Sequence, residues 1–273
     1  MKLAVSSIAW SADREEQASR VLRQAGLKGI EIAPTTIWSR PTEAPVAELD
    51  AYRDRWLERG LHIIATQALL FGRPDLVLFA DESTRQRTAA YLVEMMRVSA
   101  RLGATAMVFG SPRNRQRGEL AAPRAMDIAV RFFRPLAGAA ADLGGCLCIE
   151  GNPPAYGCDF LTSTADAAEF VGRVDHPGVR LQLDTSTMAL NGEDYAREIA
   201  GGVPLSGHVH ASEPHLVQFG GGGTDHAAAA RALRLAGYAG WVSIEMRADP
   251  RDPELAGVAE ALQRAQPEYG NDA

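Results

Sequence analysis

The sequence is short of cysteine, of long hydrophobic runs and of positive charge, and each shortage excludes a class of protein. Cys146, Cys148 and Cys158 are the only cysteines in 273 residues. So small and odd a number is typical of reduced thiols and a cytoplasmic protein, not of a disulfide framework. Cys146 and Cys148 also lack the second pair that a structural zinc site needs. The sequence contains no run of about 18 apolar residues, the length that a membrane-spanning helix needs.

The charge balance argues against polyanionic partners. The formal net charge is −6, which gives no electrostatic reason to attract nucleic acid or an anionic membrane. We therefore expect a small-molecule partner. Hydrophobic residues make up 46% of the chain, enough for a large core, and the length fits one large domain. We expect a single domain over residues 1–273, with a loose tail after about residue 265.

Short apolar or β-branched runs alternate with longer segments of helical spacing, and glycine or proline marks the joints. The predicted strands are Leu3–Ala9, Gly29–Ala33, His62–Gln67, Ala106–Phe109, Cys146–Glu150, Arg180–Asp184, Ser206–Ala211 and Trp241–Met246. The predicted helices are 13–25, 46–59, 84–102, 119–143, 163–174, 192–200, 226–236 and 253–265.

This alternation predicts an α/β fold, a single (β/α)8 TIM barrel. A doubly wound open sheet is the alternative. It is disfavoured because no predicted strand is followed by the Gly-x-Gly-x-x-Gly turn of a dinucleotide site.

Four residues with metal-ligand side chains end four successive predicted strands: Glu150, Asp184, His210 and Glu245. Their separations each approximate one strand–helix unit, so they recur at the same height and face the barrel axis. Three carboxylates brought this close cannot all ionise unless a cation compensates them. The donor set suits one divalent ion, with Mn²⁺ the first choice and Co²⁺, Mg²⁺ or Zn²⁺ as alternatives. The alternative is separate salt bridges at the barrel mouth, which is disfavoured because one such residue is commonplace but four in phase are not.

Strand parity adds a second layer to this site. Side chains two residues earlier on a strand point the same way, which places Gln182 and His208 beneath the metal set. His208 is then expected to orient a ligand and not to be one. A buried histidine that is merely hydrogen-bonded is the alternative.

These residues give the chain a resemblance to the xylose isomerase-like barrel superfamily, which includes ketose 3-epimerases, inosose dehydratases and endonuclease IV. The resemblance runs over nearly the whole chain. It is carried by Ile149-Glu150, Leu181–Thr185, His208-Val209-His210 and the stretch from Gly220 to Glu245.

In the ketose 3-epimerases, the residues at these four strand ends hold one divalent metal, and the two glutamates exchange a proton with the substrate. The resemblance gives those roles to Glu150 and Glu245. A metal bound to a carbonyl and its neighbouring hydroxyl acidifies the intervening C–H and stabilises an enediolate. Glutamates on opposite faces can then remove and return the proton.

One departure from the family concerns the substrate. The family's Asp-x-x-His motif reads Asp184-x-x-Thr187 here, and the arginine that usually follows the seventh strand has no counterpart in residues 212–216. The substrate, or the reaction, therefore differs from that of the characterised epimerases.

Several residues near the predicted strand ends are candidate substrate contacts: Glu31, Gln67, Arg113, Asn152, Thr187 and Arg247. A surface salt bridge is the alternative for Glu31, and a solvated basic loop for Arg113. The apolar segment 71–79 covers the substrate or packs against another subunit, as in a homodimer or homotetramer. The run Gly220–Gly223 closes a mobile lid or relieves strain.

The sequence thus favours a metal-dependent isomerase or epimerase acting on a sugar, sugar phosphate or cyclitol. The alternative is a dehydratase or β-eliminating lyase acting on a keto-sugar, because the loss of a β-leaving group proceeds through the same enolate. A barrel that binds a sugar without turnover is a third hypothesis. A DNA-repair phosphodiesterase is disfavoured, because its relatives use a histidine-rich cluster for several zinc ions.

Overall fold

The predicted strands close into one parallel barrel in the computed structural model, which describes residues 1–252 and 254–270. The strand order follows the chain from β1 to β8, and β8 pairs with β1. The strands are β1 (Lys2–Ser6), β2 (Gly29–Ile32), β3 (His62–Thr66), β4 (Ala106–Phe109), β5 (Cys146–Glu150), β6 (Val179–Asp184), β7 (Ser206–Ser212) and β8 (Trp241–Glu245). The (β/α)8 prediction is confirmed.

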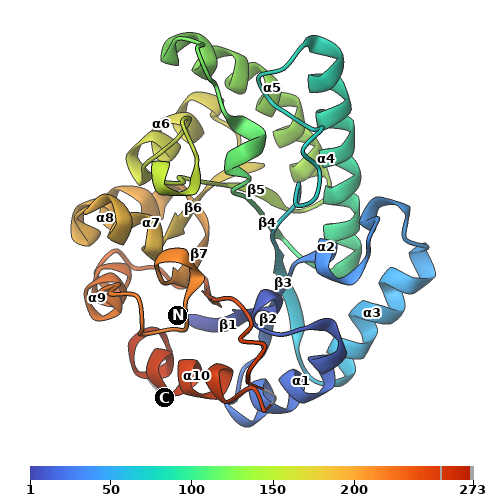
Figure 1. Ribbon diagram of the computed structural model, residues 1–273, viewed down its shortest axis with the longest axis vertical. Helices are drawn as coiled ribbons and strands as arrows, with labels where there is room; N and C mark the ends of the chain where they lie inside the picture. Colours follow the sequence, from blue (N-terminus) through green and yellow to red (C-terminus); the bar gives the residue numbers. More distant parts are fainter. Residues whose placement is uncertain (253, 271–273) are drawn as a thin grey trace.

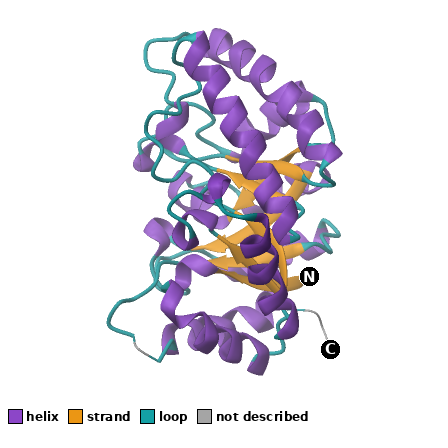
Figure 2. Cartoon of the chain, turned by 90° about the vertical axis from the view of Figure 1, so that its right-hand side faces the viewer, coloured by secondary structure: helices purple, strands orange, loops and turns teal. Residues whose placement is uncertain are grey.

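Helices surround the barrel, as Figure 1 shows in the view that looks onto the ring of strands and Figure 2 shows from the side. They are α1 (Glu15–Gln24), α2 (Pro34–Ile37), α3 (Val46–Glu58), α4 (Glu82–Leu102), α5 (Ala122–Asp142), α6 (Thr164–Val174), α7 (Thr185–Asn191), α8 (Tyr195–Gly202), α9 (His226–Leu235) and α10 (Ala256–Tyr269). None of these helices, within the part of the chain that the structure describes, has the length and hydropathy needed to cross a bilayer.

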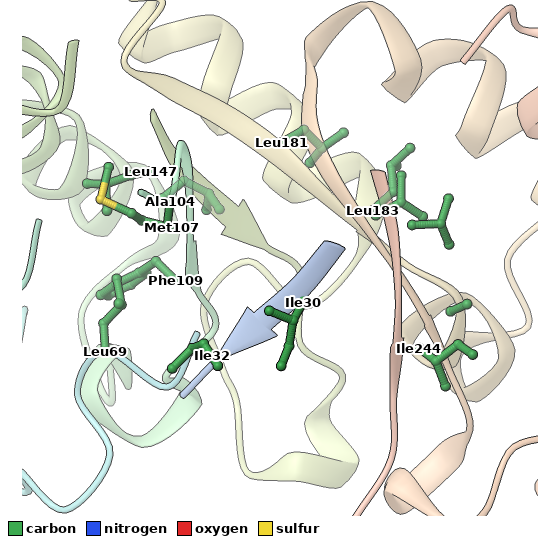
Figure 3. Close-up of a cluster of buried hydrophobic side chains, with 14 of the residues drawn as sticks. Ile30, Ile32, Leu69, Ala104, Met107, Phe109, Leu147, Leu181, Leu183 and Ile244 are labelled. Carbon is green, nitrogen blue, oxygen red and sulfur yellow. The ribbon is translucent and has the colours of Figure 1, made fainter. Parts of the chain in front are cut away.

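The main apolar core lies between the strands and the helices. Figure 3 shows side chains such as Ile30, Phe109 and Leu181 in this layer. Phe133 on α5 contacts Phe109 on β4 and Phe170 on α6 edge to face, with ring centroids 5.1 and 5.3 Å apart. Such pairs add about 0.5–1.5 kcal/mol each beyond the burial of their area. These contacts hold α5 against β4 and against the neighbouring helix α6.

The inside of the barrel is filled differently along its axis. A small apolar cluster occupies the middle: Ala4, Ile64, Ala65, Ala106, Val108 and Cys148. At the amino-terminal end of the strands, the indole of Trp241 lies so close to Gly29 that a Cβ there would be 2.4 Å from the ring. These apolar side chains and this indole fill the barrel below the carboxyl ends of the strands. The carboxyl ends are thus left for polar groups.

Three local differences from the sequence prediction concern element ends. Residues 7–9, predicted as strand, form a 3-10 helix that begins when the Ser6 hydroxyl accepts the Ile8 N–H. Helix α7 was not predicted, because it begins directly after Asp184 with no intervening loop. Helix α10 runs four residues into the tail that was expected to be loose after about residue 265, because Tyr269 is buried and its hydroxyl is hydrogen-bonded to His226. Residues 271–273 lie outside the described residues.

Candidate metal centre

The four predicted ligand residues meet at the carboxyl ends of β5 to β8. His210 Nδ1 lies 3.8 Å from Glu150 Oε1, 3.8 Å from Asp184 Oδ2 and 3.3 Å from Glu245 Oε2. Strands β5, β6, β7 and β8 are consecutive neighbours in the barrel. The recurrence of one ligand-type residue per strand–helix unit, predicted from the sequence, therefore brings three carboxylates around one imidazole nitrogen.

That nitrogen is the best test of whether a metal fits. His210 Nδ1 is buried and makes no hydrogen bond of ordinary geometry among the described residues; the carboxylate oxygen nearest to it is Glu245 Oε2, at 3.3 Å. The other ring nitrogen, Nε2, lies 3.0 and 3.1 Å from the two carboxylate oxygens of Glu31. A proton on Nε2 satisfies this pair and leaves the Nδ1 lone pair directed at the carboxylates. A carboxylate that orients a histidine in this way is the usual outer partner of a metal-bound imidazole.

The electrostatics of the carboxylates point the same way. Burial, together with the nearby Asp184 and Glu245, raises the pKa of Glu150 to about 8. Such a shift means that the carboxylates repel one another in a poorly hydrated site. A divalent cation among them would remove that repulsion, so the donor set fits one.

A second group of ligand-type atoms lies deeper and is better explained without a metal. Glu31, His208 and His210 are close together and buried. Burial alone would raise the pKa of Glu31, but His210 and His208 outweigh it and hold that pKa well below its usual range. His208 Nε2 is 2.9 Å from the Ser243 hydroxyl and 3.9 Å from Glu31. Hydrogen bonds thus account for the positions of these three residues without a metal ion. They also hold His210 in place among the four candidate ligands.

Asp184 is held by the start of α7. Its Oδ1 accepts the Thr187 N–H and the Ser186 hydroxyl, both at 2.7 Å, and its Oδ2 accepts the Ser212 hydroxyl at 2.8 Å. The residue is the N-cap of α7, and polar side chains at this position stabilise a helix by about 1 kcal/mol. Folding of α7 therefore fixes the carboxylate before any ligand arrives.

Glu150 is held from two neighbouring loops. Asn152 donates to its Oε2 at 2.7 Å. Gly110, just after β4, lies beneath the same oxygen, and a Cβ there would be 2.3 Å from it. The Arg115 guanidinium donates to the Glu150 carbonyl at 2.6 Å. The side chain of Glu150 is thus confined to the space above the end of β4.

Arg115 is a residue whose role the sequence did not reveal. Arg113 was the predicted contact, yet Arg113 is exposed and Arg115 is 1% exposed. Two of the Arg115 guanidinium nitrogens, Nε and Nη1, have no hydrogen-bond partner in residues 1–252 and 254–270. Spacing alone does not distinguish the two arginines, because a 3-10 helix over Pro112–Arg115 decides which one turns inward.

The predicted substrate contacts are not gathered in one place. Glu31 is buried against His210, and the Thr187 hydroxyl donates to the Gly151 carbonyl at 2.8 Å. Both side chains therefore have protein partners in place of the substrate expected for them. Gln67 is buried and donates to Ser6 at 2.6 Å. Arg247 is exposed.

The second predicted layer is partly as expected. His208 lies edge to face with His210, with ring centroids 5.5 Å apart. Gln182 pairs in register with Glu150 and His208. Its amide is buried, but neither end has a hydrogen-bond partner in the described chain. Glu31, not Gln182 or His208, is the residue that orients the imidazole.

Two further residues near the ligand set were not predicted as site residues. The Tyr156 hydroxyl accepts the His215 N–H at 2.8 Å, and the two rings lie edge to face at 5.7 Å. Burial raises the pKa of Tyr156, and Ser186 lies close enough to oppose that shift. Tyr156 follows β5 and His215 follows β7, so this pair links two loops beside the ligands. An aromatic residue soon after a ligand-bearing strand was the available signal.

Comparison with known proteins agrees with this architecture. A family model described as xylose isomerase-like TIM barrel matches residues 19–267. A search of curated proteins finds no match.

Among solved structures, D-psicose 3-epimerase crystallised with D-fructose has a TM-score of 0.83 and 20% identity, covering 99% of this chain and 100% of that chain. A 3-keto-D-glucoside 4-epimerase from E. coli has a TM-score of 0.76 and 20% identity, covering 97% and 99%. A probable 3-DHS dehydratase from Bacillus anthracis has a TM-score of 0.74 and 14% identity, covering 96% and 98%. At these identities the likeness shows a shared fold.

Proposed function

The chain belongs to the family of xylose isomerase-like TIM barrels, and on that premise we propose that it is a divalent-metal-dependent isomerase or epimerase of a small sugar or cyclitol. In this proposal Glu150, Asp184, His210 and Glu245 hold one metal ion, most suitably Mn²⁺. The partner is a small polyhydroxylated molecule, not nucleic acid or a membrane.

The observation that carries the proposal is the orientation of His210. Its Nε2 is taken by Glu31, while Nδ1 is buried, lacks a hydrogen-bond partner in the described residues and faces three carboxylates. A purely structural histidine would be expected to satisfy both nitrogens. An imidazole oriented through one nitrogen, with the other lone pair free, is prepared for coordination.

The chain's own residues can then move a proton. A bound divalent ion would polarise a substrate carbonyl and acidify the adjacent C–H. Glu150 comes from β5 and Glu245 from β8, so the two carboxylates approach the mouth from separate strands. One removes the proton from the substrate carbon and the other returns it. Asn152 keeps Glu150 Oε2 engaged and leaves Oε1 on the His210 side.

A metal-dependent dehydratase acting on a keto-sugar is the second candidate, and Thr187 favours it. The Thr187 hydroxyl is committed to the Gly151 carbonyl, so the chain has no histidine at the position that contacts substrate in the epimerases it resembles. With a β-leaving group, proton removal by the same carboxylate leads to elimination. The similarity in fold to a probable dehydratase is compatible with this alternative.

The remaining assignments are proposals of smaller scope. We place Asn152, Tyr156 and His215 beside the substrate. We assign the protein to the cytoplasm, because its three cysteines are free thiols and disulfides are rare there. Phe71 is 70% exposed in the apolar segment after β3, and we assign this segment to a homodimer or homotetramer contact.

The test combines metal content with proton exchange. Elemental mass spectrometry of the purified protein should find about one Mn²⁺, Co²⁺, Mg²⁺ or Zn²⁺ per chain. The loaded protein is then incubated in D₂O with D-fructose, D-tagatose, D-allulose and a keto-inositol. An isomerase gives a deuterated isomer, whereas a lyase gives a dehydrated product that absorbs in the ultraviolet.

Two variants separate an enzyme from a binding protein. Glu150→Gln and Glu245→Gln are measured at a metal concentration that saturates each variant, because both residues are also proposed ligands. They should abolish exchange while calorimetry still detects the bound sugar, because an amide can hold the ion but cannot transfer the proton. A metal-free protein that also rejects added divalent ions would overturn the proposed function.

A further inference from the structure

Glu213, the first residue after β7, is a buried carboxylate that the proposed reaction does not use. It lies three residues beyond His210 and is 1% exposed. Its Oε1 accepts the Gly220 N–H at 2.7 Å, and its Oε2 accepts the Thr224 N–H at 2.9 Å. The glycine run between those residues is therefore wrapped around a carboxylate. Backbone N–H groups that converge in this way form an anion-binding concavity.

The wrapping depends on glycine. A Cβ at Gly222 would lie 2.8 Å from Glu213 Oε2 and 2.9 Å from Glu213 Cβ. Gly220 and Gly223 have φ of +84° and +89°, a region that side chains disfavour. The two sequence interpretations, a mobile lid or a relief of strain, are thus replaced by a third one, an anchor around Glu213.

The anchor continues to the last helix. His226 Nε2 lies 3.3 Å from Glu213 Oε1, and His226 Nδ1 is 2.8 Å from the Tyr269 hydroxyl. Phe219 stacks on the imidazole with ring centroids 4.0 Å apart. A hydroxyl that donates to Nδ1 places the imidazole proton on Nε2, facing the carboxylate. His226 Nε2 is buried and makes no hydrogen bond of ordinary geometry within the described residues, so its link to Glu213 is a close polar contact. Glu213, His226 and Tyr269 thus form a buried chain of one such contact and one hydrogen bond, from β7 to the end of α10.

The anchored segment touches the strand ends that carry three of the candidate ligands. Leu216 accepts the Arg247 N–H at 2.9 Å, two residues after Glu245. Thr224 Oγ1 donates to the Ser212 carbonyl at 3.0 Å, and the Ser212 hydroxyl donates to Asp184. His210 precedes the segment on β7 itself. A displacement of the segment would therefore reach Asp184, His210 and Glu245 together.

The backbone of the segment is strained, which requires an anchor. His215 and Leu216 are consecutive non-glycine residues with φ of +61° and +56°. Such conformations persist where the surroundings over-determine them. The Glu213 carboxylate holds the far end of this segment at Gly220 and Thr224.

We propose that Glu213 is a positioning residue of the metal centre, acting through the segment 213–224, and that His226 and Tyr269 couple the end of α10 to that centre. The inference rests on the proposed function, because it presupposes that the centre binds a metal. In this proposal the glycine-rich segment is held in one position, and the Glu213 carboxylate sets the spacing between the ends of β6, β7 and β8.

The test uses the full-length protein loaded with Co²⁺, whose visible absorption reports the geometry of its ligands. Glu213→Gln keeps the size of the side chain but replaces one of its two acceptors with a donor. We expect Co²⁺ and Mn²⁺ to bind about tenfold more weakly, at the low end of the range for partners outside the ligand shell. The Co²⁺ spectrum should change, and amide hydrogen exchange over residues 219–224 should accelerate.

Asp194→Asn is the matched control. The Asp194 carboxylate also accepts two backbone N–H groups, those of Ala196 and Arg197, but it caps α8 and, in the described part of the chain, makes no hydrogen bond to β7. This variant should leave both the metal affinity and the Co²⁺ spectrum unchanged at a temperature where each variant is folded.

Tyr269→Phe gives a milder variant in case Glu213→Gln does not fold. It removes one hydroxyl from the chain to His226 and should weaken metal binding about threefold, less than the change expected at a direct outer partner. In the double variant the two effects should be less than additive, because Tyr269 acts on the centre through His226 and Glu213, and the carboxylate is already lost in Glu213→Gln. Unchanged metal affinity and spectrum in both single variants would overturn the positioning role alone. A parent protein that binds no divalent ion would instead refute the proposed function.

Discussion

The two halves of the barrel contribute different groups to one site. Strands β5, β6 and β8 end in Glu150, Asp184 and Glu245, and His210 lies two residues before the end of β7. The ligand atoms of these four residues face one another. Strands β1 to β4 supply groups that satisfy or confine these residues, such as Glu31 on β2 and Gly110 after β4. Glu31 contacts a histidine on β7, across the interior of the barrel. One half thus supplies the ligands, and the other half sets the orientation and space that they require.

The largest effect should come from removing a ligand in the β5–β8 half. Asp184→Ala should weaken Mn²⁺ binding by more than about a hundredfold, beyond the range for partners outside the ligand shell. Loss of the α7 cap should also lower stability by about 0.5–2 kcal/mol. Titration calorimetry and thermal unfolding measure the two effects separately. If Asp184→Ala retained normal metal affinity, Asp184 would not be a ligand, and the assignment of the ligands to the β5–β8 half would be wrong.

An intermediate effect is expected on the opposite side. Glu31→Gln keeps a hydrogen-bond acceptor for His210 but removes the charge that orients and polarises the imidazole. Metal affinity should fall by about 10- to 100-fold. Electron paramagnetic resonance of free Mn²⁺ gives the dissociation constant. A loss equal to that of Asp184→Ala would mean that Glu31 is itself a ligand, and the comparison would have to be redrawn.

The smallest effect concerns space and not charge. Gly110→Ala places a methyl group where Glu150 Oε2 now lies, so the carboxylate must rotate and one ligand is misplaced. We expect metal affinity to fall by a few-fold, up to about tenfold. Arg113→Ala, in the same loop, is the control, because its side chain is exposed. Equal affinities for both variants would show that β4 does not confine Glu150.

The sequence was sufficient for the β5–β8 half and insufficient for the other. Asp184 and His210 fall in the same phase of their strands, so periodicity alone predicts one height for them, and they are register partners in the structure. The partnership of Glu31 with His210 depends on side chains that meet across the barrel, and no local pattern records that. The register shift between Ile30 and Glu31 adds a further change that spacing does not reveal.

The loops illustrate a second limit. Arg113 and Arg115 are equivalent by composition, and a 3-10 turn decides which of them is buried. Gly220–Gly223 was interpretable only as flexible or strain-relieving, because the carboxylate that it surrounds is separated from it in sequence. Helix α7 escaped prediction because Asp184 ends a strand and begins a helix at the same residue.

That double position of Asp184 has a consequence for engineering. One carboxylate closes a strand, caps a helix and faces the proposed ion, so its oxygens are shared among several hydrogen-bond donors and the ion. A designer cannot tune metal affinity here without also altering the local fold. Changes of specificity are better sought at Tyr156, in the loop after β5, because its side chain contacts neither oxygen of Asp184 in the hydrogen bonds above.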